Sequence, residues 1–138
     1  MILPDSSAWI EFLRATGSPA HQAMRELVRR PSSLVTTEPV VMEILVGVRG
    51  DAQVAKHRAL LLDLRLLPIG GLAGFEEAAW IARRCRSAGE TIRSLVDCLV
   101  AVPALRAGAS VLHMDRDFEV IARHTGLRVE PVPSDRSG

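Results

Sequence analysis

The first nine residues, Met-Ile-Leu-Pro-Asp-Ser-Ser-Ala-Trp (1–9), contain the first element and the first acid of the chain. Met1 to Pro4 is an apolar run too short for a helix, so it predicts a β-strand. Asp5 ends the run, and the two serines after it can cap a helix that continues to about Ala15. A carboxylate directly after a strand lies at the carboxyl edge of a sheet, where open parallel sheets bind ligands.

Short apolar runs alternate with helical patterns along the rest of the chain. Runs of strand length predict strands, and a 3.6-residue period bounded by capping residues predicts helices. The strands are expected at 1–4, 34–36, 66–69, 110–112 and 127–129, and the helices at about 7–15, 19–30, 38–48, 51–64, 75–88, 95–107 and 118–124. Strands that alternate with helices imply a parallel sheet with helices on both faces. We therefore expect an α/β fold, a five-stranded parallel sheet sandwiched between about seven helices.

The length and composition predict a single intracellular domain. The 138 residues fit one domain, expected over residues 1–130, and the Pro/Ser-rich residues 131–138 are expected to form a flexible tail. The two cysteines form no CxxC pair and are too few for a disulfide framework, which favours the reducing cytoplasm. We expect no signal peptide, because Asp5 interrupts the N-terminal apolar run. The uncharged stretch from Leu99 to Leu105 is too short to span a membrane.

The formal net charge of +1 hides an uneven distribution of charge. The basic residues are arginines except for Lys56. If four of the 16 acids occupied one metal site, the remaining acids would be outnumbered by the 17 basic residues elsewhere. An arginine-rich surface around an acidic pocket suits a phosphodiester backbone. A general preference of the genome for arginine explains the same composition equally well.

Four carboxylates from distant parts of the chain are expected at one sheet edge. Asp5 and Asp115 follow strands, and Asp97 lies in the first turn of a helix that enters the same edge. Glu43 is the only charge in the middle of an otherwise apolar helix, which suggests that it faces a cleft. Carboxylates brought together repel one another unless a cation lies between them, and hard oxygen donors suit Mg²⁺ or Mn²⁺. Such a site can hydrolyse phosphodiester bonds.

Each of these acids also has a purely structural interpretation. Asp5 can simply cap the first helix, and Ser94 with Asp97 fits a capping box. For Asp117, the interpretation as the cap of the last helix is favoured over a role in binding metal. Glu43 can be an ordinary solvated helix residue.

Four sequence blocks resemble the VapC toxins, the PIN-domain ribonucleases of VapBC operons. The blocks span nearly the whole chain in the order of the family, at residues 1–9, 38–45, 89–99 and 115–122. The resemblance implies a PIN fold and an Mg²⁺- or Mn²⁺-dependent endoribonuclease that acts as a toxin and cuts tRNA or ribosomal RNA. It also implies a homodimer and inhibition by a cognate VapB-type antitoxin.

The resemblance further implies which residues form the site. The metal ligands and catalytic acids match Asp5, Glu43, Asp97 and Asp115. Three residues match positions of the second shell or the substrate contacts, namely Ser6, where the family usually has threonine, Arg93 and Asp117. Pro4 departs from the family pattern, because proline cannot donate a ladder hydrogen bond and is normally kept from central strands. It can therefore shift Asp5.

Other functions are weighed against this interpretation. A catalytically inactive PIN domain that only binds an antitoxin is the main alternative, and the presence of all four acids argues against it. A phosphatase of the haloacid dehalogenase type needs a second aspartate where Ser7 stands. A receiver domain needs a late lysine, and a nucleotide-binding loop needs a glycine pattern that residues 70–74 lack.

The remaining polar and aromatic residues are expected to be structural. Cys85 and Cys98 should be buried as small apolar residues. Trp9, Phe12, Trp80 and Phe118 lie on predicted helices and should pack rather than stack on bases. His113 is near enough to Asp115 to contact RNA, although core or surface filling is favoured.

Overall fold

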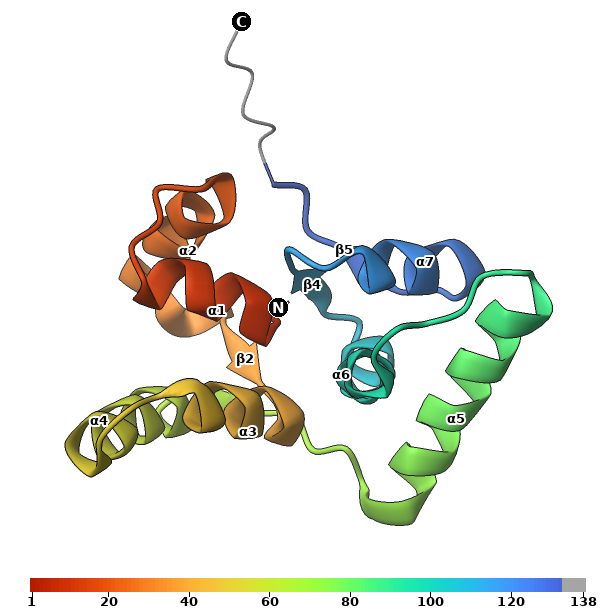
Figure 1. Ribbon diagram of the computed structural model, residues 1–138, viewed down its shortest axis with the longest axis horizontal. Coiled ribbons are helices and arrows are strands. Elements are labelled where there is room, and N and C mark those ends of the chain that lie inside the picture. The colour runs from red at the N-terminus through yellow and green to blue at the C-terminus, as the bar shows by residue number, and fades with distance from the viewer. Residues whose placement is uncertain (133–138) are drawn as a thin grey trace, which may run out of the picture.

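The computed structural model describes residues 1–132, in which helices and strands alternate as expected (Figure 1). The strands are β1 (Ile2–Pro4), β2 (Val35–Thr36), β3 (Arg65–Leu66), β4 (Ser110–Leu112) and β5 (Arg128–Val129). The helices are α1 (Ser6–Leu13), α2 (Pro19–Arg29), α3 (Glu38–Gly47), α4 (Asp51–Leu62), α5 (Gly71–Ser87), α6 (Leu95–Ala107) and α7 (Arg116–His124). The predicted α/β class is confirmed. The predicted tail falls mostly on residues 133–138, which lie outside the described residues.

The five strands are parallel, but they do not form one sheet, so the prediction of a five-stranded sheet is wrong. One sheet has the order β1-β4-β5 and the other pairs β2 with β3. A single bridge between Ile2 and Leu34 joins them.

Pro4 explains why the sheet is interrupted between β1 and β2. The carbonyl of Met1 accepts from Ser110 and the amide of Asp5 donates to Leu112, so the odd-numbered residues of β1 bond to β4. Pro4 therefore faces β2, and it has no N–H to donate. The pairing with β4 is intact, so Asp5 still leaves the strand at the sheet edge.

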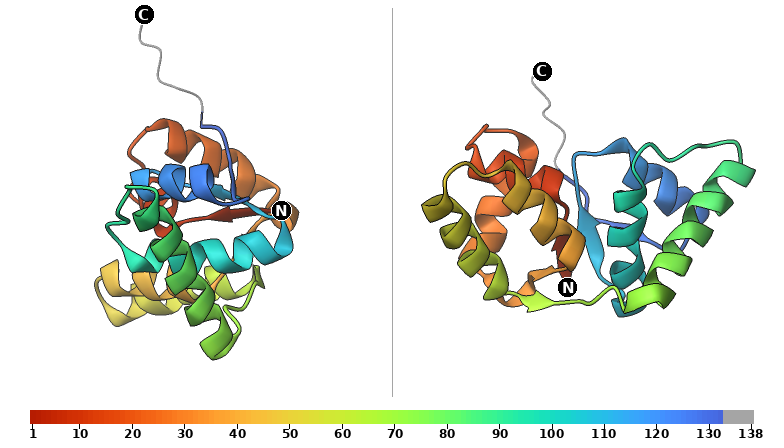
Figure 2. Two further views of the ribbon diagram at one scale, coloured as in Figure 1. Left: turned by 90° about the vertical axis from the view of Figure 1, so that its right-hand side faces the viewer. Right: turned by 60° about the horizontal axis from the view of Figure 1, so that its bottom comes forward.

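The helices lie in two groups beside the strands, α1 to α4 in one and α5 to α7 in the other (Figure 2). Helix α6 is the central helix of the core, because it is apolar around most of its circumference. Its buried residues include Val100, Ala101, Val102 and Ala104, and it continues through Pro103 without ending. Burial of each larger apolar side chain contributes about 1.5–3 kcal/mol. The core therefore holds α6 firmly, and with it Asp97 in the first turn of the helix.

Helix α5 differs from its prediction in its start and in the exposure of Trp80. It begins at Gly71, because Gly70 adopts a left-handed conformation that allows the sharp entry. The buried face holds Gly74, Ala78, Ile81 and Cys85, so neither Phe75 nor Trp80 lies on it. Phe75 is 55% exposed and Trp80 is 66% exposed, so the prediction that Trp80 is a packed side chain is wrong.

Three further expectations can be compared with the structure. Cys85 and Cys98 are buried and free, as predicted. Trp9 is buried in the core, also as predicted. No helix within residues 1–132 combines the length and the apolar character that crossing a membrane requires.

Candidate metal centre

Asp5 combines a structural role with an unused oxygen atom. It is the N-cap of α1, and its Oδ2 accepts hydrogen bonds from the Ser7 amide at 3.1 Å and the Ser7 hydroxyl at 2.7 Å. The Ser7 hydroxyl also accepts from the Met114 amide at 3.0 Å, which ties α1 to the loop after β4. Asp5 Oδ1 is buried and has no partner among the described residues. The capping role therefore leaves one oxygen free for a cation.

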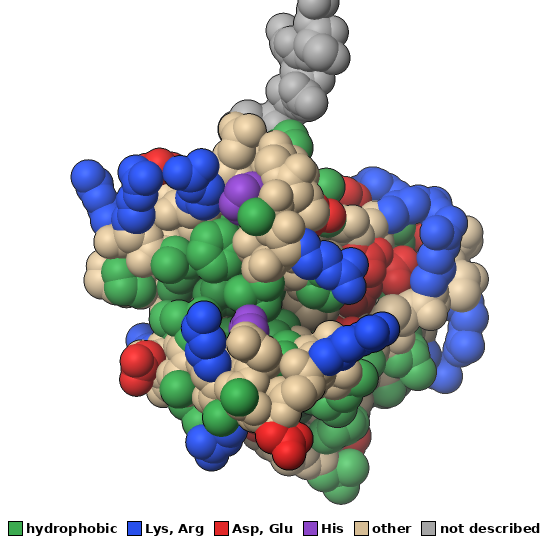
Figure 3. All heavy atoms as spheres, turned by 60° about the vertical axis from the view of Figure 1, so that its left-hand side comes forward, with side chains coloured by type: hydrophobic (Ala, Val, Ile, Leu, Met, Phe, Trp, Pro, Cys, Tyr) green, Lys and Arg blue, Asp and Glu red, His purple; other side chains and the backbone are tan. Residues whose placement is uncertain are grey.

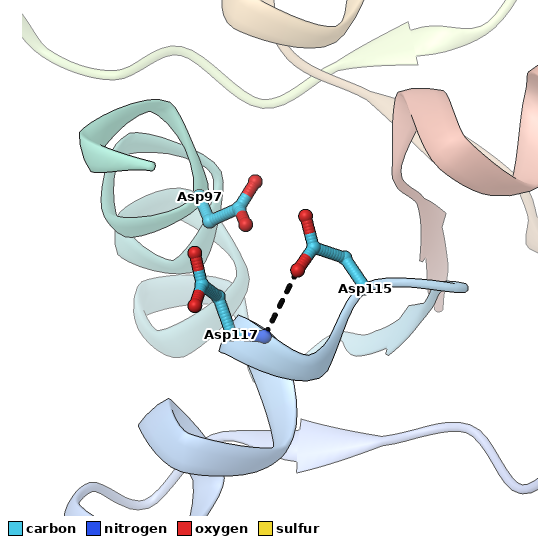
Figure 4. Close-up of side chains that lie close together, drawn as sticks. All are labelled: Asp97, Asp115 and Asp117. Carbon is cyan, nitrogen blue, oxygen red and sulfur yellow. Dashed lines mark hydrogen bonds between the residues drawn. The ribbon is translucent and has the colours of Figure 1, made fainter. Parts of the chain in front are cut away.

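Asp115, and not Asp117, caps α7. The Asp115 Oδ1 atom accepts from the Asp117 amide at 2.9 Å (Figure 4). The Asp117 carboxylate instead accepts from the Arg93 amide at 3.1 and 3.2 Å and from the Ser94 amide at 2.8 Å. The prediction that Asp117 caps α7 is therefore wrong, because this side chain caps the start of α6. The tertiary packing of α7 against the start of α6 decides this, and local sequence cannot show it.

Asp97 lies one turn into α6 and joins the carboxylates of the last strand–helix connection. Asp97, Asp115 and Asp117 each offer one oxygen, and these atoms all lie within 4.8 Å of one another (Figure 4). Asp97 is only 3% exposed, and its Oδ2 has no partner among residues 1–132. The expected capping box is absent, because the Ser94 hydroxyl makes no cap hydrogen bond. Asp97 is therefore free to serve the site.

Glu43 reaches the same site from α3. Its Oε1 accepts a hydrogen bond from the Ser6 hydroxyl at 2.9 Å, across 37 positions of sequence. Burial raises the pKa of Glu43, the Ser6 hydroxyl opposes that shift, and the charges of Asp5 and Asp115 add to it. The repulsion places all three carboxylates in one electrostatic cluster. The expectation that Glu43 faces a cleft stays a prediction.

Among these carboxyl groups, Asp97 has the most strongly raised pKa. Burial raises its pKa to about 9, and the neighbouring Asp115 carboxyl and the charges of Asp5 and Asp117 contribute. Burial likewise raises the pKa of Asp5, against the effect of the Ser7 hydrogen bonds. Without a cation, the cluster therefore holds a proton on Asp97 at neutral pH.

The rim of the site carries positive charge. Arg93 is exposed, and its backbone is fixed at the start of α6 by Asp117. Among the described residues no carboxylate forms an ion pair with Arg93. Acidic side chains gather in a recess bordered by lysine or arginine side chains (Figure 3). Positive side chains are therefore available beside the acids for a polyanion.

Two residues support the site in ways that the sequence did not predict. Ser7 links Asp5 to the loop after β4, as described above. His113 Nδ1 accepts from the Asp115 amide at 3.1 Å, and its ring packs on Phe118 with the centroids 5.2 Å apart. His113 therefore packs against α7, as the favoured expectation had it, and also accepts a hydrogen bond from the Asp115 amide. The position of His113 two residues before Asp115 could have indicated this role from the sequence. The direction of the His113 ring, however, depends on tertiary packing.

The comparisons with known proteins agree with this fold. The profile of the PIN domain family matches residues 2–124. The VapC ribonuclease Mb1587 of Mycobacterium bovis and ribonuclease VapC11 of Mycobacterium tuberculosis are each 44% identical over 129 residues. These matches cover 93% of this chain and 96% of each relative. The chain therefore belongs to the PIN domain family and, within it, to the VapC ribonucleases.

Solved structures share the fold at lower sequence identity. FitAcB from Neisseria gonorrhoeae has a TM-score of 0.71 at 21% identity, covering 95% of this chain and 97% of that one. VapBC2 from Rickettsia felis, bound to a DNA fragment from its promoter, has a TM-score of 0.70 at 15% identity, with coverage of 94% and 98%. At these identities the likeness concerns the fold.

Proposed function

We propose that this protein is a divalent-metal-dependent endoribonuclease and the toxin of a type II toxin–antitoxin system. Membership of the VapC ribonucleases carries the toxin role and the cleavage of RNA. The observation that supports the metal dependence is the pair of buried oxygens without a partner among residues 1–132, Asp5 Oδ1 and Asp97 Oδ2, which belong to carboxylates that repel each other.

The ligands proposed for Mg²⁺ or Mn²⁺ are Asp5, Glu43, Asp97 and Asp115. Their donors are all carboxylate oxygens, the set that these hard cations prefer. Buried carboxylate oxygens without hydrogen bonds are costly, and a cation would offset both that cost and the mutual repulsion. When bound, the ion would supply water activation and stabilisation of charge on the phosphoryl oxygen.

The chain's own residues hold this arrangement in place. Ser6 positions Glu43, Ser7 positions Asp5, and His113 positions Asp115 through its amide. The Asp117 carboxylate accepts hydrogen bonds from the Arg93 and Ser94 amides at the start of α6. We therefore propose that Asp117 supports Asp97 and does not bind the metal. Arg93, free of ion pairs among the described residues, would contact the phosphates of the substrate.

The proposed substrate is tRNA or ribosomal RNA in the cytoplasm. Lysine or arginine side chains border the acidic recess (Figure 3), and the chain's basic residues are arginines except for Lys56. They support a folded polyanion as the ligand, since guanidinium groups bind phosphates in a bidentate manner.

The proposed partners are a VapB-type antitoxin and a second copy of the chain. The VapBC2 neighbour supports the first of these. Met42 and Val46 on α3, which are 53% and 82% exposed, support the second, because exposed large apolar side chains on one helix are typical of an interface. Residues 1–130 would form the single domain that makes these contacts.

Cleavage of bulk tRNA and ribosomal RNA by the purified, antitoxin-free protein tests the proposal. We expect cleavage with Mg²⁺ or Mn²⁺, none in EDTA, and a loss of at least about 100-fold in the Asp97→Asn variant. The exposed-surface variant Glu26→Gln should cleave like the wild type. Folded protein that cuts neither RNA with either metal would favour the alternative, an inactive PIN domain that only binds an antitoxin.

A further inference from the structure

A cavity of about 700 Å³ lies between α5 and the C-terminal ends of α6 and α7. It is distinct from the metal centre, because none of the clustered carboxylates lines it. Asp97 and Leu105, which lines the cavity, are eight residues apart on α6, or about 12 Å along the helix axis. The left view of Figure 2 shows α5 crossing in front of α6 at this side of the molecule. The volume is within the range of small-ligand sites.

Trp80 is the prominent feature of this cavity. Its side chain is 66% exposed, whereas the chain's other tryptophan, Trp9, is 1% exposed. The Arg83 guanidinium carbon lies 5.3 Å from the centre of the Trp80 ring, a cation–π contact that stiffens both side chains. An exposed indole held by an arginine is a platform on which a flat ring can stack.

The charge that remains free around the cavity is positive. Glu77, which lines the cavity, is neutralised by Arg106 through hydrogen bonds of 2.8 and 3.2 Å. Arg83 and Arg84 also line it, and within residues 1–132 neither forms an ion pair. Thr125 and Leu105 also line the cavity. The cavity therefore combines an aromatic surface with two available guanidinium groups.

We propose that this cavity is a second RNA-binding site, which holds one nucleotide of the substrate away from the point of cleavage. A base stacks on Trp80, and the adjoining phosphate pairs with Arg84 and Arg83. RNA is the occupant that the free positive charge and the proposed ribonuclease function favour, since each of its units brings both a stackable ring and a phosphate. The inference rests on the proposed ribonuclease function and adds a determinant of substrate choice. Because the cavity and the acids lie at opposite ends of α6, it engages RNAs large or folded enough to reach both.

Binding of fluorescently labelled bulk tRNA to the Asp97→Asn protein in EDTA tests this site without cleavage. The dissociation constant is measured by anisotropy for that protein and for further variants in the same background. Trp80→Ala and Arg84→Ala should each weaken binding about ten-fold, while Trp80→Phe should restore most of the affinity because it retains a stacking ring. The matched control Arg25→Ala removes an exposed arginine on α2, far along the chain from the cavity, and should change binding less than two-fold. Quenching of Trp80 fluorescence by tRNA gives a direct readout.

Equal affinities of the Trp80→Ala, Arg84→Ala and Arg25→Ala proteins would overturn the proposal. So would a change from dimer to monomer by light scattering in Trp80→Ala, since the surface would then be an interface between copies. Cleavage of the same tRNA by the wild-type protein with Mn²⁺ is measured in parallel. If the wild type cleaves the tRNA and the Trp80 and Arg84 variants bind it with unchanged affinity, only the proposed second site is refuted. If the protein neither cleaves nor binds the tRNA, the proposed function is refuted as well.

Discussion

Replacing Asp97 by asparagine should stabilise the metal-free protein while abolishing its response to metal. The folded state holds the pKa of Asp97 at about 9, against an ordinary value of 3.8. The folded state therefore binds a proton that the unfolded state releases, so stability must fall as pH rises between about 4 and 9. The slope is about 1.4 kcal/mol per pH unit for one proton. Asparagine carries no proton to lose and removes this slope.

The size of the effect at pH 7 follows from the same quantities. At pH 7, about three pH units above the ordinary pKa of an aspartate, the stability that the wild type has lost relative to acid pH is at most about 4 kcal/mol. Solvent in the recess screens the group, and we expect about 2 kcal/mol. For a chain of this length that corresponds to a rise in Tm of roughly 8 °C.

Thermal unfolding followed by circular dichroism in EDTA at pH 5, 7 and 8.5 measures the effect. The gap between Asp97→Asn and wild type should widen with pH, and Glu26→Gln should show no such gap. Addition of Mn²⁺ at about 100 times its dissociation constant should stabilise the wild type by about 2.7 kcal/mol and the variant far less. The electrostatic reasoning is refuted if the metal-free wild type is as stable at pH 8.5 as at pH 5, or if Asp97→Asn is the less stable protein at pH 7.

Three other substitutions test the surroundings of the site. Ser6→Ala removes the hydrogen bond to Glu43 and should weaken Mn²⁺ binding several-fold by calorimetry, whereas Ser6→Thr should keep wild-type affinity. Asp117→Ala leaves two amides at the start of α6 unpaired and should lower the free energy of unfolding in urea by about 1–3 kcal/mol. It should also reduce the affinity for Mn²⁺. A loss of stability with unchanged Mn²⁺ affinity would show that Asp117 serves folding alone. Gly74→Ala places a Cβ 2.1 Å from the Ile69 carbonyl oxygen and should lower stability by more than about 2 kcal/mol, and a variant as stable as wild type would show that α5 can move away.

The sequence by itself determined the order and type of the elements and the acids at the sheet edge. Period and capping residues are local properties, so α2, with Ser18 as its cap and Pro19 in its first turn, lies within one residue of its predicted bounds. The carboxyl ends of parallel strands lie at one edge of a sheet, so the sequence alone predicts that Asp5 and Asp115 lie close together.

Only the tertiary structure decided which partners these residues find. Asp117 caps α6 rather than its own helix because two segments 23 positions apart pack together, and the interruption beside Pro4 depends on which neighbour that residue faces. The sequence could not show which face of α5 is exposed either, since apolar residues lie on more than one side of this helix. Local interactions fix elements because they involve residues close in sequence. The pKa of Asp97 and the exposure of Trp80 depend on distances that exist only after the chain has folded.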